Sequence, residues 1–341
     1  MPHKKTRQQR PTESERSLLA WLKRKKATYG LIGDDAAVLP ERGEHVITVD
    51  TQIAGVHFPA DIDERVLAKR LLAVNLSDIA AMGARPAHAF LALAAPQGFD
   101  HRSFFSAFLD GCANYELVLA GGDLASAKRI FLSLTLVGEH WKGVKRWLRR
   151  STARPGEAVW IGGDPGWASL GLELSRLGGR LRGRRVELPR EARLPENQHR
   201  AARRALRSHF QPVPQLDLGR WLARQHDGAA CDVSDGLARD LRNLCSASGH
   251  GAVLDRELLP LAPDFRDLAA HLGLDPLTQI LGGGEDYLLL FTLPPTKAPP
   301  AELRCRRLGA IVEGSELHLR DRLGGFSPLP DLGWDHLGSY L

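Results

Sequence analysis

The sequence is poor in cysteine, and the few that it has are scattered. Four occur among 341 residues, with no Cys-x-x-Cys pair and no histidine at metal-ligand spacing: Cys112, Cys231, Cys245 and Cys305. This pattern argues against a disulfide framework and against a zinc site. It suits a reducing compartment, so we expect a cytoplasmic protein.

Long apolar runs are also missing. No stretch approaches the roughly 20 apolar residues that a membrane-spanning helix needs. The basic segment Met1–Pro11 lacks the apolar stretch that follows the charged start of a secretory signal. We therefore expect residues 1–12 to form a disordered basic tail, and we expect no membrane partner.

The familiar nucleotide-binding signatures are absent as well. The sequence contains no Gly-x-x-x-x-Gly-Lys-Ser/Thr loop and no Gly-x-Gly-x-x-Gly after an expected strand. It also lacks the His-Arg-Asp and Asp-Phe-Gly motifs of protein kinases. Any phosphate chemistry in this chain must therefore use a different set of residues.

The net charge of +6 raises the question of nucleic-acid binding. Arginine is concentrated between Arg176 and Arg207, but this stretch has almost no aromatic residue to stack on bases. Such a stretch is more often a solvated face, and a basic surface also suits an anionic substrate. We expect residues 180–190 to form a loop and keep nucleic-acid binding only as an alternative.

The pattern of apolar residues predicts alternating strands and helices. Short apolar runs predict strands at Val46–Val49, Leu117–Ala120, Ala158–Ile161, Ala229–Val233 and Tyr287–Thr292. A helical face begins at Glu64 and carries Leu67, Leu71 and Val74, and a further helix follows Gly236. The length and a basic connection near residue 145, together with this pattern, indicate a two-domain α/β protein, with domains at 13–145 and 146–341.

Aspartates recur at the ends of these apolar runs, often beside glycine. They are Asp34, Asp35, Asp50, Asp123, Asp232 and Asp235, and Asp78 lies on the apolar face of the helix that begins at Glu64. A carboxylate among apolar neighbours is costly unless it is paired, hydrogen-bonded or bound to a metal. Mg²⁺ prefers oxygen ligands and completes its shell with water and phosphate, and glycine lets backbone N–H groups approach phosphate oxygens. The set therefore predicts a site for several magnesium ions and a nucleotide.

Each of these motifs taken alone also has a structural explanation. A single Gly-Asp is most often a turn, and Ser234-Asp235-Gly236 fits a helix cap. Asp78 fits such an explanation least well, because its helical neighbours are apolar. The residues alone thus indicate a magnesium-dependent, phosphate-handling protein and leave its substrate open.

A series of longer motifs runs through the chain from about Gly30 to His336. They are Gly33-Asp34-Asp35-Ala36-Ala37-Val38, Asp50-Thr51, Gly55-Val56-His57-Phe58, the string Ala73–Ala84, Gly121-Gly122-Asp123, Asp232-Val233-Ser234-Asp235-Gly236-Leu237, Gly283-Gly284-Glu285-Asp286-Tyr287 and Gly333-Trp334-Asp335-His336. In this order they resemble the motifs of the thiamine-monophosphate kinase family. The string Ala73–Ala84 is the longest and most specific of them.

The resemblance implies a fold and a reaction. The fold is the two-domain α/β fold shared with aminoimidazole ribonucleotide synthetase and selenophosphate synthetase, whose N-terminal sheet forms a homodimer. The reaction is phosphorylation of thiamine monophosphate to thiamine diphosphate by direct in-line transfer from ATP, with several Mg²⁺ ions. ATP and thiamine monophosphate are then the expected small-molecule partners.

The resemblance also implies a set of site residues. The metal-binding positions of the family correspond to Asp35, Thr48, Asp50, Asp78, Asp123, Asp232 and Asp235. The ATP-contacting positions correspond to Gly122, Asp123, Arg150 and Ser234, and those that hold the thiamine phosphate to His57, Glu285 and Trp334.

One loop departs from the family pattern. The family usually has Thr-Thr-Arg after Gly-Gly-Asp, whereas this chain has Leu124-Ala125-Ser126. The change removes hydroxyls and an arginine near the nucleotide phosphates. It leaves open a related kinase with another small phosphorylated acceptor, and a protein that binds a nucleotide or nucleic acid without catalysis.

Overall fold

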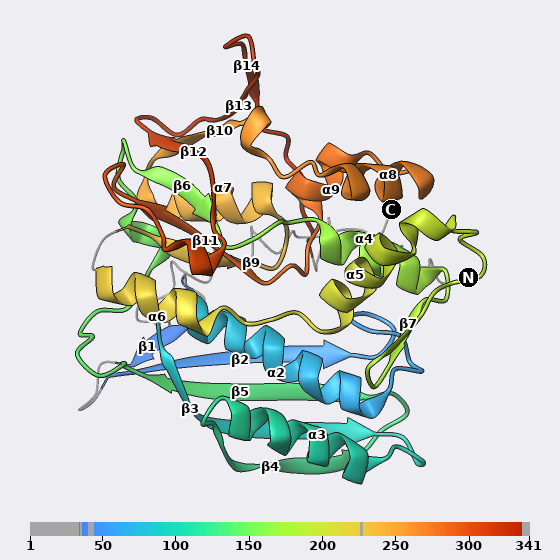
Figure 1. The fold of residues 1–341 in the computed structure, drawn as a ribbon. Coiled ribbons are helices and arrows are strands. Elements are labelled where there is room, and N and C mark those ends of the chain that lie inside the picture. Colours follow the sequence, from blue (N-terminus) through green and yellow to red (C-terminus); the bar gives the residue numbers. More distant parts are fainter. Residues whose placement is uncertain (1–33, 35, 40–43, 226–227, 336–341) are drawn as a thin grey trace, which may run out of the picture.

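The structure is a computed structural model that describes residues 34, 36–39, 44–225 and 228–335. In this part of the chain, most strands belong to a five-stranded sheet and a seven-stranded sheet (Figure 1). The strands of the first sheet all precede residue 140, and those of the second all follow residue 157. The connection between the sheets contains the expected domain boundary near residue 145, which stays a prediction.

The first sheet has the strand order β1-β2-β5-β3-β4, and its pairs are antiparallel except for β3 with β4. Its strands are β1 (Ala37–Leu39), β2 (His45–Ile53), β3 (Arg85–Ala95), β4 (Val118–Ser126) and β5 (Phe131–Glu139). Two helices, α2 (Glu64–Ala81) and α3 (His101–Asn114), cover one face of this sheet (Figure 1). Alternate residues of β2, β3 and β5 are buried beneath them, as the period of a half-covered strand requires.

Two strands of this sheet are longer than the sequence predicted. β2 runs through Asp50 to Ile53, and Val49 is exposed, so a short buried strand ending at Asp50 was wrong. β4 continues through Gly122 and Asp123 to Ser126 instead of ending before them. A bulge shifts the register of β4 against β3, and pairing with β3 then continues through the glycines. Backbone pairing, which apolar content does not reveal, keeps these residues in the strand.

Helix α2 lies between the two sheets, and it is buried on nearly all sides (Figure 1). Asp63 caps its first turn by accepting hydrogen bonds from Arg65 N at 3.0 Å and Val66 N at 3.2 Å. Such a cap contributes about 1 kcal/mol to helix stability. The helix predicted from Glu64 is confirmed, and its all-round burial fits a position between two layers.

The second sheet has the strand order β14-β13-β10-β12-β6-β11-β9. Its strands are β6 (Ala158–Ile161), β9 (Ala230–Val233), β10 (Gly251–Asp255), β11 (Leu288–Leu293), β12 (Arg306–Val312), β13 (Leu317–Arg320) and β14 (Phe326–Pro328). The helices around it are α4 (Trp167–Arg176), α5 (His199–Phe210), α6 (Leu216–Gln225), α7 (Leu237–Ser248), α8 (Pro263–His271) and α9 (Pro276–Gly282). Short 3₁₀ turns occur at Arg150–Thr152, Glu196–Gln198, Arg256–Leu258 and Ala301–Leu303. Among the described helices, none has the length and apolar character that a membrane crossing requires.

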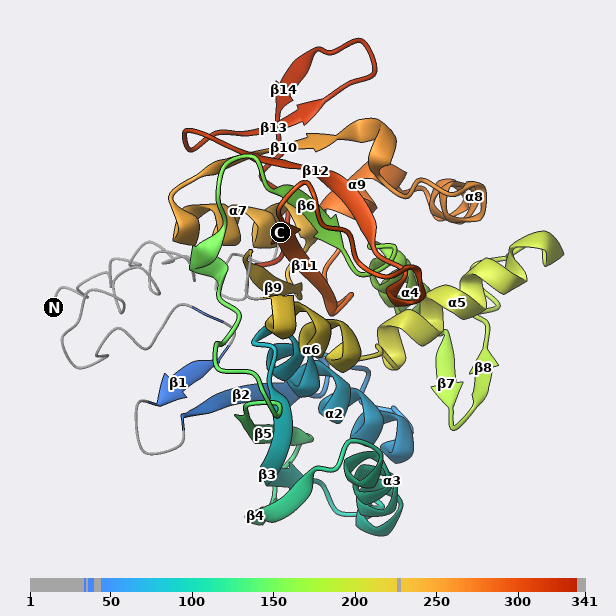
Figure 2. The ribbon, with the colours of Figure 1, turned by 60° about the vertical axis from the view of Figure 1, so that its left-hand side comes forward.

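The arginine-rich stretch is more regular than the sequence predicted. Residues 180–187 form a hairpin of β7 (Arg180–Arg182) and β8 (Arg185–Glu187) rather than a loop (Figure 2). Arg180 Nε donates to both carboxylate oxygens of Asp61, at 2.9 and 3.0 Å. Gly183 N donates to Asp63 Oδ2 at 3.1 Å. These long-range bonds tie the hairpin to the segment before α2, and no local pattern of apolar residues predicts them.

Candidate functional site

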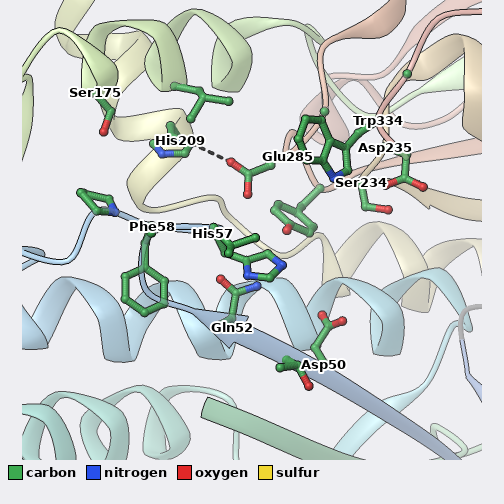
Figure 3. A pocket seen from close by; sticks show the side chains of 18 of the residues that line it. Asp50, Gln52, His57, Phe58, Ser175, His209, Ser234, Asp235, Glu285 and Trp334 are labelled. Carbon is green, nitrogen blue, oxygen red and sulfur yellow. Dashed lines mark ion pairs between the residues drawn. The ribbon is translucent and has the colours of Figure 1, made fainter. Parts of the chain in front are cut away.

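A cavity of about 1100 Å³ lies where β2 and α2 of the first half meet the second half of the chain (Figure 3). Its wall comes from β2 and the loop after it, the end of α2, helices α4 and α5, the turn after β9, the loop before β11 and residues 333–335. The predicted site residues that line it are Asp50, His57, Asp78, Asp232, Ser234, Asp235, Glu285 and Trp334. Segments far apart in the sequence are thus brought to one place.

Two of the acids that line the cavity accept hydrogen bonds from hydroxyl groups. Thr48 Oγ1, on β2, donates a hydrogen bond to Asp78 Oδ2 on α2. One residue earlier on α2, Ser77 Oγ donates to Asp232 Oδ2 on β9 at 2.7 Å. Thr48 is buried and does not line the cavity, but it contacts an acid that does. The end of α2 is therefore hydrogen-bonded to β2 through Thr48 and to β9 through Asp232.

The turn between β9 and α7 presents Ser234 and Asp235 to the cavity. Gly236 has a φ of +121°, and a Cβ there would lie 2.8 Å from the carbonyl oxygen of Gly282, so only glycine fits. Asp235 N donates to Oδ2 of the buried Asp240 at 3.1 Å. The predicted Ser-Asp-Gly motif is a helix start, and its two polar residues also face the cavity.

The C-terminal segment closes one side of the cavity. Trp334 N donates to the carbonyl oxygen of Asp235 at 2.9 Å, and Arg239 donates to the carbonyl oxygen of Trp334. Trp334 is 40% exposed and lines the cavity, so it is not simply a core residue. In Figure 3 it lies on the same side as Glu285 and Ser234.

His57 lies in the loop after β2, and its ring is oriented by the backbone. Ile53 N donates to His57 Nδ1 at 3.0 Å. Nδ1 therefore acts as an acceptor, and the neutral ring carries its proton on Nε2. In Figure 3 the ring of His57 lies between Glu285 and Asp50. His57 can thus present a donor to a ligand in the cavity.

Gly122 and Asp123 do not reach this cavity. Across the sheet, Asp123 on β4 is paired with Ala92 on β3, and Ala92 is paired with Ser133 on β5. Ser133 is paired with Thr51 on β2, which lines the cavity. With strands about 4.8 Å apart, three steps place Asp123 about 14 Å from Thr51. Glycine is required at position 122 for a structural reason, because a Cβ there would lie 2.0 Å from Leu91 O.

Arg150 is also absent from the cavity wall. Its backbone N donates to Asp34 Oδ1 at 2.9 Å, and Arg149 Nη1 lies 3.3 Å from Asp34 Oδ2. The segment thus contacts the first acid of the predicted Asp34–Asp35 pair. Asp35 itself lies outside the described residues, as does His336.

The described acids do not form a preassembled metal site. Within residues 44–225 and 228–335, together with the short described piece before them, no three His, Cys, Asp or Glu side chains are grouped closely enough to hold an ion. The cavity instead offers separate carboxylates on β2, α2 and β9. Magnesium commonly takes one or two carboxylates from a protein and its remaining ligands from water and phosphate.

Sequence patterns missed several residues that shape the cavity. Gln52 lines it, Ser77 bonds Asp232, and Arg70 and His209 contact Glu285. A signal existed for Arg70, because it lies three residues after Leu67 and shares its apolar helical face. No local signal marks His209, whose role depends on a contact between α5 and a distant loop.

Comparisons with known proteins identify sequences similar to this chain. The family described as "AIR synthase related protein, N-terminal domain" matches residues 33–140. The thiamine-monophosphate kinase of Escherichia coli strain K12 is 37% identical over 284 residues, which cover 82% of this chain and 80% of that protein.

Solved structures extend the similarity to the whole fold. The structure described as AaThiL complexed with AMPPCP and TMP has a TM-score of 0.81 at 27% identity, covering 95% of this chain and 97% of that one. Thiamine-monophosphate kinase from Stenotrophomonas maltophilia K279a has a TM-score of 0.67 at 32% identity, covering 84% and 89%. The α/β fold expected from the sequence motifs is confirmed.

Proposed function

The chain belongs to the thiamine-monophosphate kinase family, and from that premise we propose that it transfers the γ-phosphoryl group of ATP to thiamine monophosphate. The products are ADP and thiamine diphosphate. The cavity carries this proposal, because it combines carboxylates on β2, α2 and β9 with Trp334, His57 and Glu285. The related AaThiL structure contains AMPPCP, an analogue of ATP, together with TMP, which supports the same pair of substrates here.

The donor set of the cavity fits Mg²⁺ and the phosphates of ATP. Asp50, Asp78 and Asp232 offer carboxylate oxygens, which are the ligands that Mg²⁺ prefers. The other proposed metal positions are Asp35, Thr48, Asp123 and Asp235, and the proposed ATP contacts are Gly122, Asp123, Arg150 and Ser234. When bound, Mg²⁺ neutralises charge between the two anionic substrates. Because no three of the described acidic, histidine or cysteine side chains are close enough to hold an ion together, phosphate oxygens and water would supply the remaining ligands of each Mg²⁺ ion.

The other side of the cavity suits thiamine monophosphate. The face of Trp334 can stack on the cationic thiazolium ring, because aromatic rings attract cations. Glu285 can accept a hydrogen bond from the amine of the pyrimidine ring. Nε2–H of His57 can donate to the acceptor phosphate. Each role uses a group that the cavity wall presents.

We propose direct in-line transfer without a phosphorylated protein intermediate. Phosphoryl transfer between two bound anions mainly needs alignment and charge neutralisation. The acceptor oxygen attacks the γ-phosphorus as its bond to the ADP oxygen breaks. His57, Glu285 and Trp334 hold the acceptor, and the acids of β2, α2 and β9 bind the donor with its metal ions. No side chain is required as a nucleophile.

We propose that the chain forms a homodimer through the open face of the first sheet. Val49, Phe90, Val118 and Phe131 lie on the face away from α2 and α3, and they are 41–59% exposed. An apolar face of this kind is typical of an interaction surface. Asp123 lies on the same face, because it pairs with the exposed Ala92. Asp123 would then act at the cavity of the partner copy.

Mixing two inactive variants tests this arrangement. Asp123→Asn and Asp232→Asn chains, mixed so that dimers exchange, should regain activity if Asp123 acts across the dimer. In a mixed dimer, one cavity would then have both native acids. No recovery despite proven exchange would contradict the arrangement, and a monomer in light scattering would contradict the dimer.

A cytoplasmic location and a domain boundary at residue 145 remain part of the proposal. The four cysteines form no disulfide, and three of them are buried, as suits a reducing compartment. The first sheet would then belong to an N-terminal domain that binds ATP and metal, and the second sheet to a C-terminal α/β domain.

Nucleic-acid binding receives little support from the arginine-rich stretch. Arg180 and Arg182 bind Asp61, and Arg204 pairs with Asp164 while lying 4.1 Å above the ring of Trp167. Arginines engaged within the protein are poorly placed to follow a phosphate backbone. Weak binding to random DNA at low salt would agree with this view, whereas strong binding that falls steeply with salt would favour the alternative.

A kinase that acts on another small phosphorylated substrate remains the second candidate. The reason is that Leu124-Ala125-Ser126 replaces the Thr-Thr-Arg that the family usually has after Gly-Gly-Asp. Purified protein should be assayed with ATP, Mg²⁺ and thiamine monophosphate, and the thiamine phosphates separated by chromatography. We expect thiamine diphosphate in step with ADP, lost with EDTA and restored by added Mg²⁺. A folded protein that binds ATP and Mg²⁺ but forms no thiamine diphosphate would favour the second candidate.

A further inference from the structure

A buried arginine stands behind the acceptor side of the cavity. Arg70, on α2, has a side chain with 0% exposure, although guanidinium is a permanent cation. One of its terminal nitrogens donates to Glu285 Oε1, and the other donates to the carbonyl oxygen of His209. Burying such a charge costs several kcal/mol unless it is well paired. The contact therefore joins α2, α5 and the loop before β11.

His209 engages the second oxygen of the same carboxylate. Its Nδ1 lies 2.9 Å from Glu285 Oε2, and its side chain is 1% exposed. Burial lowers the pKa of His209, although the nearby Glu285 opposes that shift. Nδ1 contacts Glu285 Oε2 at ion-pair distance but is not aligned for a hydrogen bond, so the contact is mainly electrostatic. Arg70 and His209 thus hold one carboxylate from two sides.

Glu285 is fixed in orientation by its backbone as well. It has a φ of +67° and Tyr287 has a φ of +52°, values that non-glycine residues rarely adopt. Glu285 N donates to Ser234 O at 2.7 Å, and Tyr287 N donates to Val233 O at 2.8 Å. Such a conformation persists only where its surroundings enforce it, and it occurs often at functional sites.

The carboxylate remains partly open to the cavity. The side chain of Glu285 is 22% exposed and lines the cavity wall. The hydrogen bond from Arg70 and the contact with His209 occupy only part of the acceptor capacity of a carboxylate, which has about four lone-pair sites. Burial opposes ionisation, but Arg70, His209 and His57 outweigh it and lower the pKa of Glu285 to about 2. Glu285 is therefore an anionic acceptor throughout the neutral range.

We propose that Arg70 and His209 are positioning residues that hold Glu285 as a preoriented carboxylate for a hydrogen-bond donor on the acceptor substrate. This role rests on the proposed function, in which the donor is the amine of the pyrimidine ring of thiamine monophosphate. A carboxylate held in place before binding does not need to be reoriented or desolvated when the substrate arrives. The same pair also discriminates against other phosphorylated substrates that place a hydrogen-bond acceptor, rather than a donor, opposite Glu285.

Two pairs of variants test the role. Arg70→Met removes the charge and keeps the apolar stem, whereas Arg70→Lys keeps a charge without the fork of donors. His209→Leu removes the contact, whereas His209→Asn keeps an N–H near the position of Nδ1. Arg65→Met, an exposed site on the same helix, is the matched control. The His209 variants leave the charge pair intact, so they report even where Arg70→Met does not fold.

The expected result is a rise in KM for one substrate only. Losing either contact that holds Glu285 should raise KM for thiamine monophosphate by about 10- to 100-fold, and KM for ATP by less than about threefold. The Lys and Asn variants should recover part of the loss, and the Arg65→Met control should match wild type. Equal rises for both substrates, or no recovery in the conservative variants, would overturn the role.

A pH profile separates positioning from a general loss of structure. The groups that act on Glu285 are Arg70 from α2, His209 from α5, His57 from the loop after β2, and its own neighbours Asp286 and Tyr287. Without Arg70, burial should raise the pKa of Glu285, so kcat/KM for thiamine monophosphate should fall at mildly acidic pH in Arg70→Met relative to wild type. Matching profiles would overturn the role.

The outcome also distinguishes the role from the proposed function. A wild-type enzyme that forms no thiamine diphosphate would overturn the proposed function, and this role with it. An active wild type whose variants show no selective change in KM would overturn the role alone.

Discussion

Replacing Trp334 by alanine should weaken the binding of thiamine monophosphate and leave the binding of ATP nearly unchanged. The backbone of Trp334 is anchored independently of its ring, through its N–H to Asp235 and its carbonyl to Arg239. Truncation should therefore remove the indole while residues 333–335 stay in place. A partly exposed ring over a cation contributes about 0.5–2 kcal/mol, which corresponds to a rise in KM of about 2- to 30-fold.

The assay measures initial rates while one substrate is varied and the other is saturating. Trp334→Phe should lose less than Trp334→Ala, because phenylalanine keeps an aromatic face. Phe326→Ala serves as a control, since Phe326 is exposed on β14, outside the lining of the cavity. Equal rises in KM for ATP and for thiamine monophosphate would refute the stacking role and indicate that the indole is only packing.

Three further predictions address the metal ligands, the stability and the first sheet. Asp50→Asn and Asp123→Asn should each abolish turnover with unchanged circular dichroism, and near wild-type activity in either would contradict its role as a ligand. Burial raises the pKa of Asp286 to about 7. The carboxylate accepts hydrogen bonds from the N–H groups of Gly166 and Ala168, which lower its pKa but do not outweigh burial. Its stabilising contribution is therefore full below about pH 4 and lost as pH rises through about 7. Between about pH 5 and 8, wild type should lose about 2–3 kcal/mol of unfolding free energy relative to Asp286→Asn in urea titrations, and parallel curves would contradict this. Gly122→Ala should lower the unfolding free energy by about 1–3 kcal/mol, because the added Cβ would clash with Leu91 O. Gly121→Ala is the control and should not lower it, because its added Cβ would make only an ordinary contact of 3.4 Å. Equal stability of the two variants would contradict the steric explanation.

The elements that the sequence predicted well are those whose signal is local. Helix α2 and the strands β6 and β9 follow from apolar patterns, and α7 ends at Ser248, where Gly249 adopts a φ of +75°. Asp78 faces the cavity, as its place on the apolar side of the helix suggested. Local chemistry is sufficient in these places because the same residues decide the element and its boundaries.

The wrong predictions concern features that depend on distant partners. β4 continues through Gly122 because β3 pairs with it, and the β7–β8 hairpin is held by the contact of Arg180 with Asp61. The sequence also placed Asp50 at a strand end, whereas β2 carries it mid-strand. The residues behind Glu285 come from segments up to 215 positions away, so spacing alone does not reveal them.

The placement of the metal-binding and substrate-binding residues stays a prediction that the cavity supports only in part. Eight of these residues share one wall, while Thr48 reaches it through Asp78 and Asp123 lies on the other face of the first sheet. A single chain therefore presents most of the proposed site, and the proposed homodimer would give a physical reason for the position of Asp123.

The most direct test of the central claim is a single-turnover experiment with ATP labelled at the γ-phosphate, excess enzyme, Mg²⁺ and thiamine monophosphate. We expect the label to appear in thiamine diphosphate at the rate at which ATP disappears, with none retained on the protein and no transfer in EDTA. Label that stays on the protein before reaching the acceptor would contradict direct transfer. The absence of labelled thiamine diphosphate from a folded, ATP-binding protein would contradict the proposed function itself.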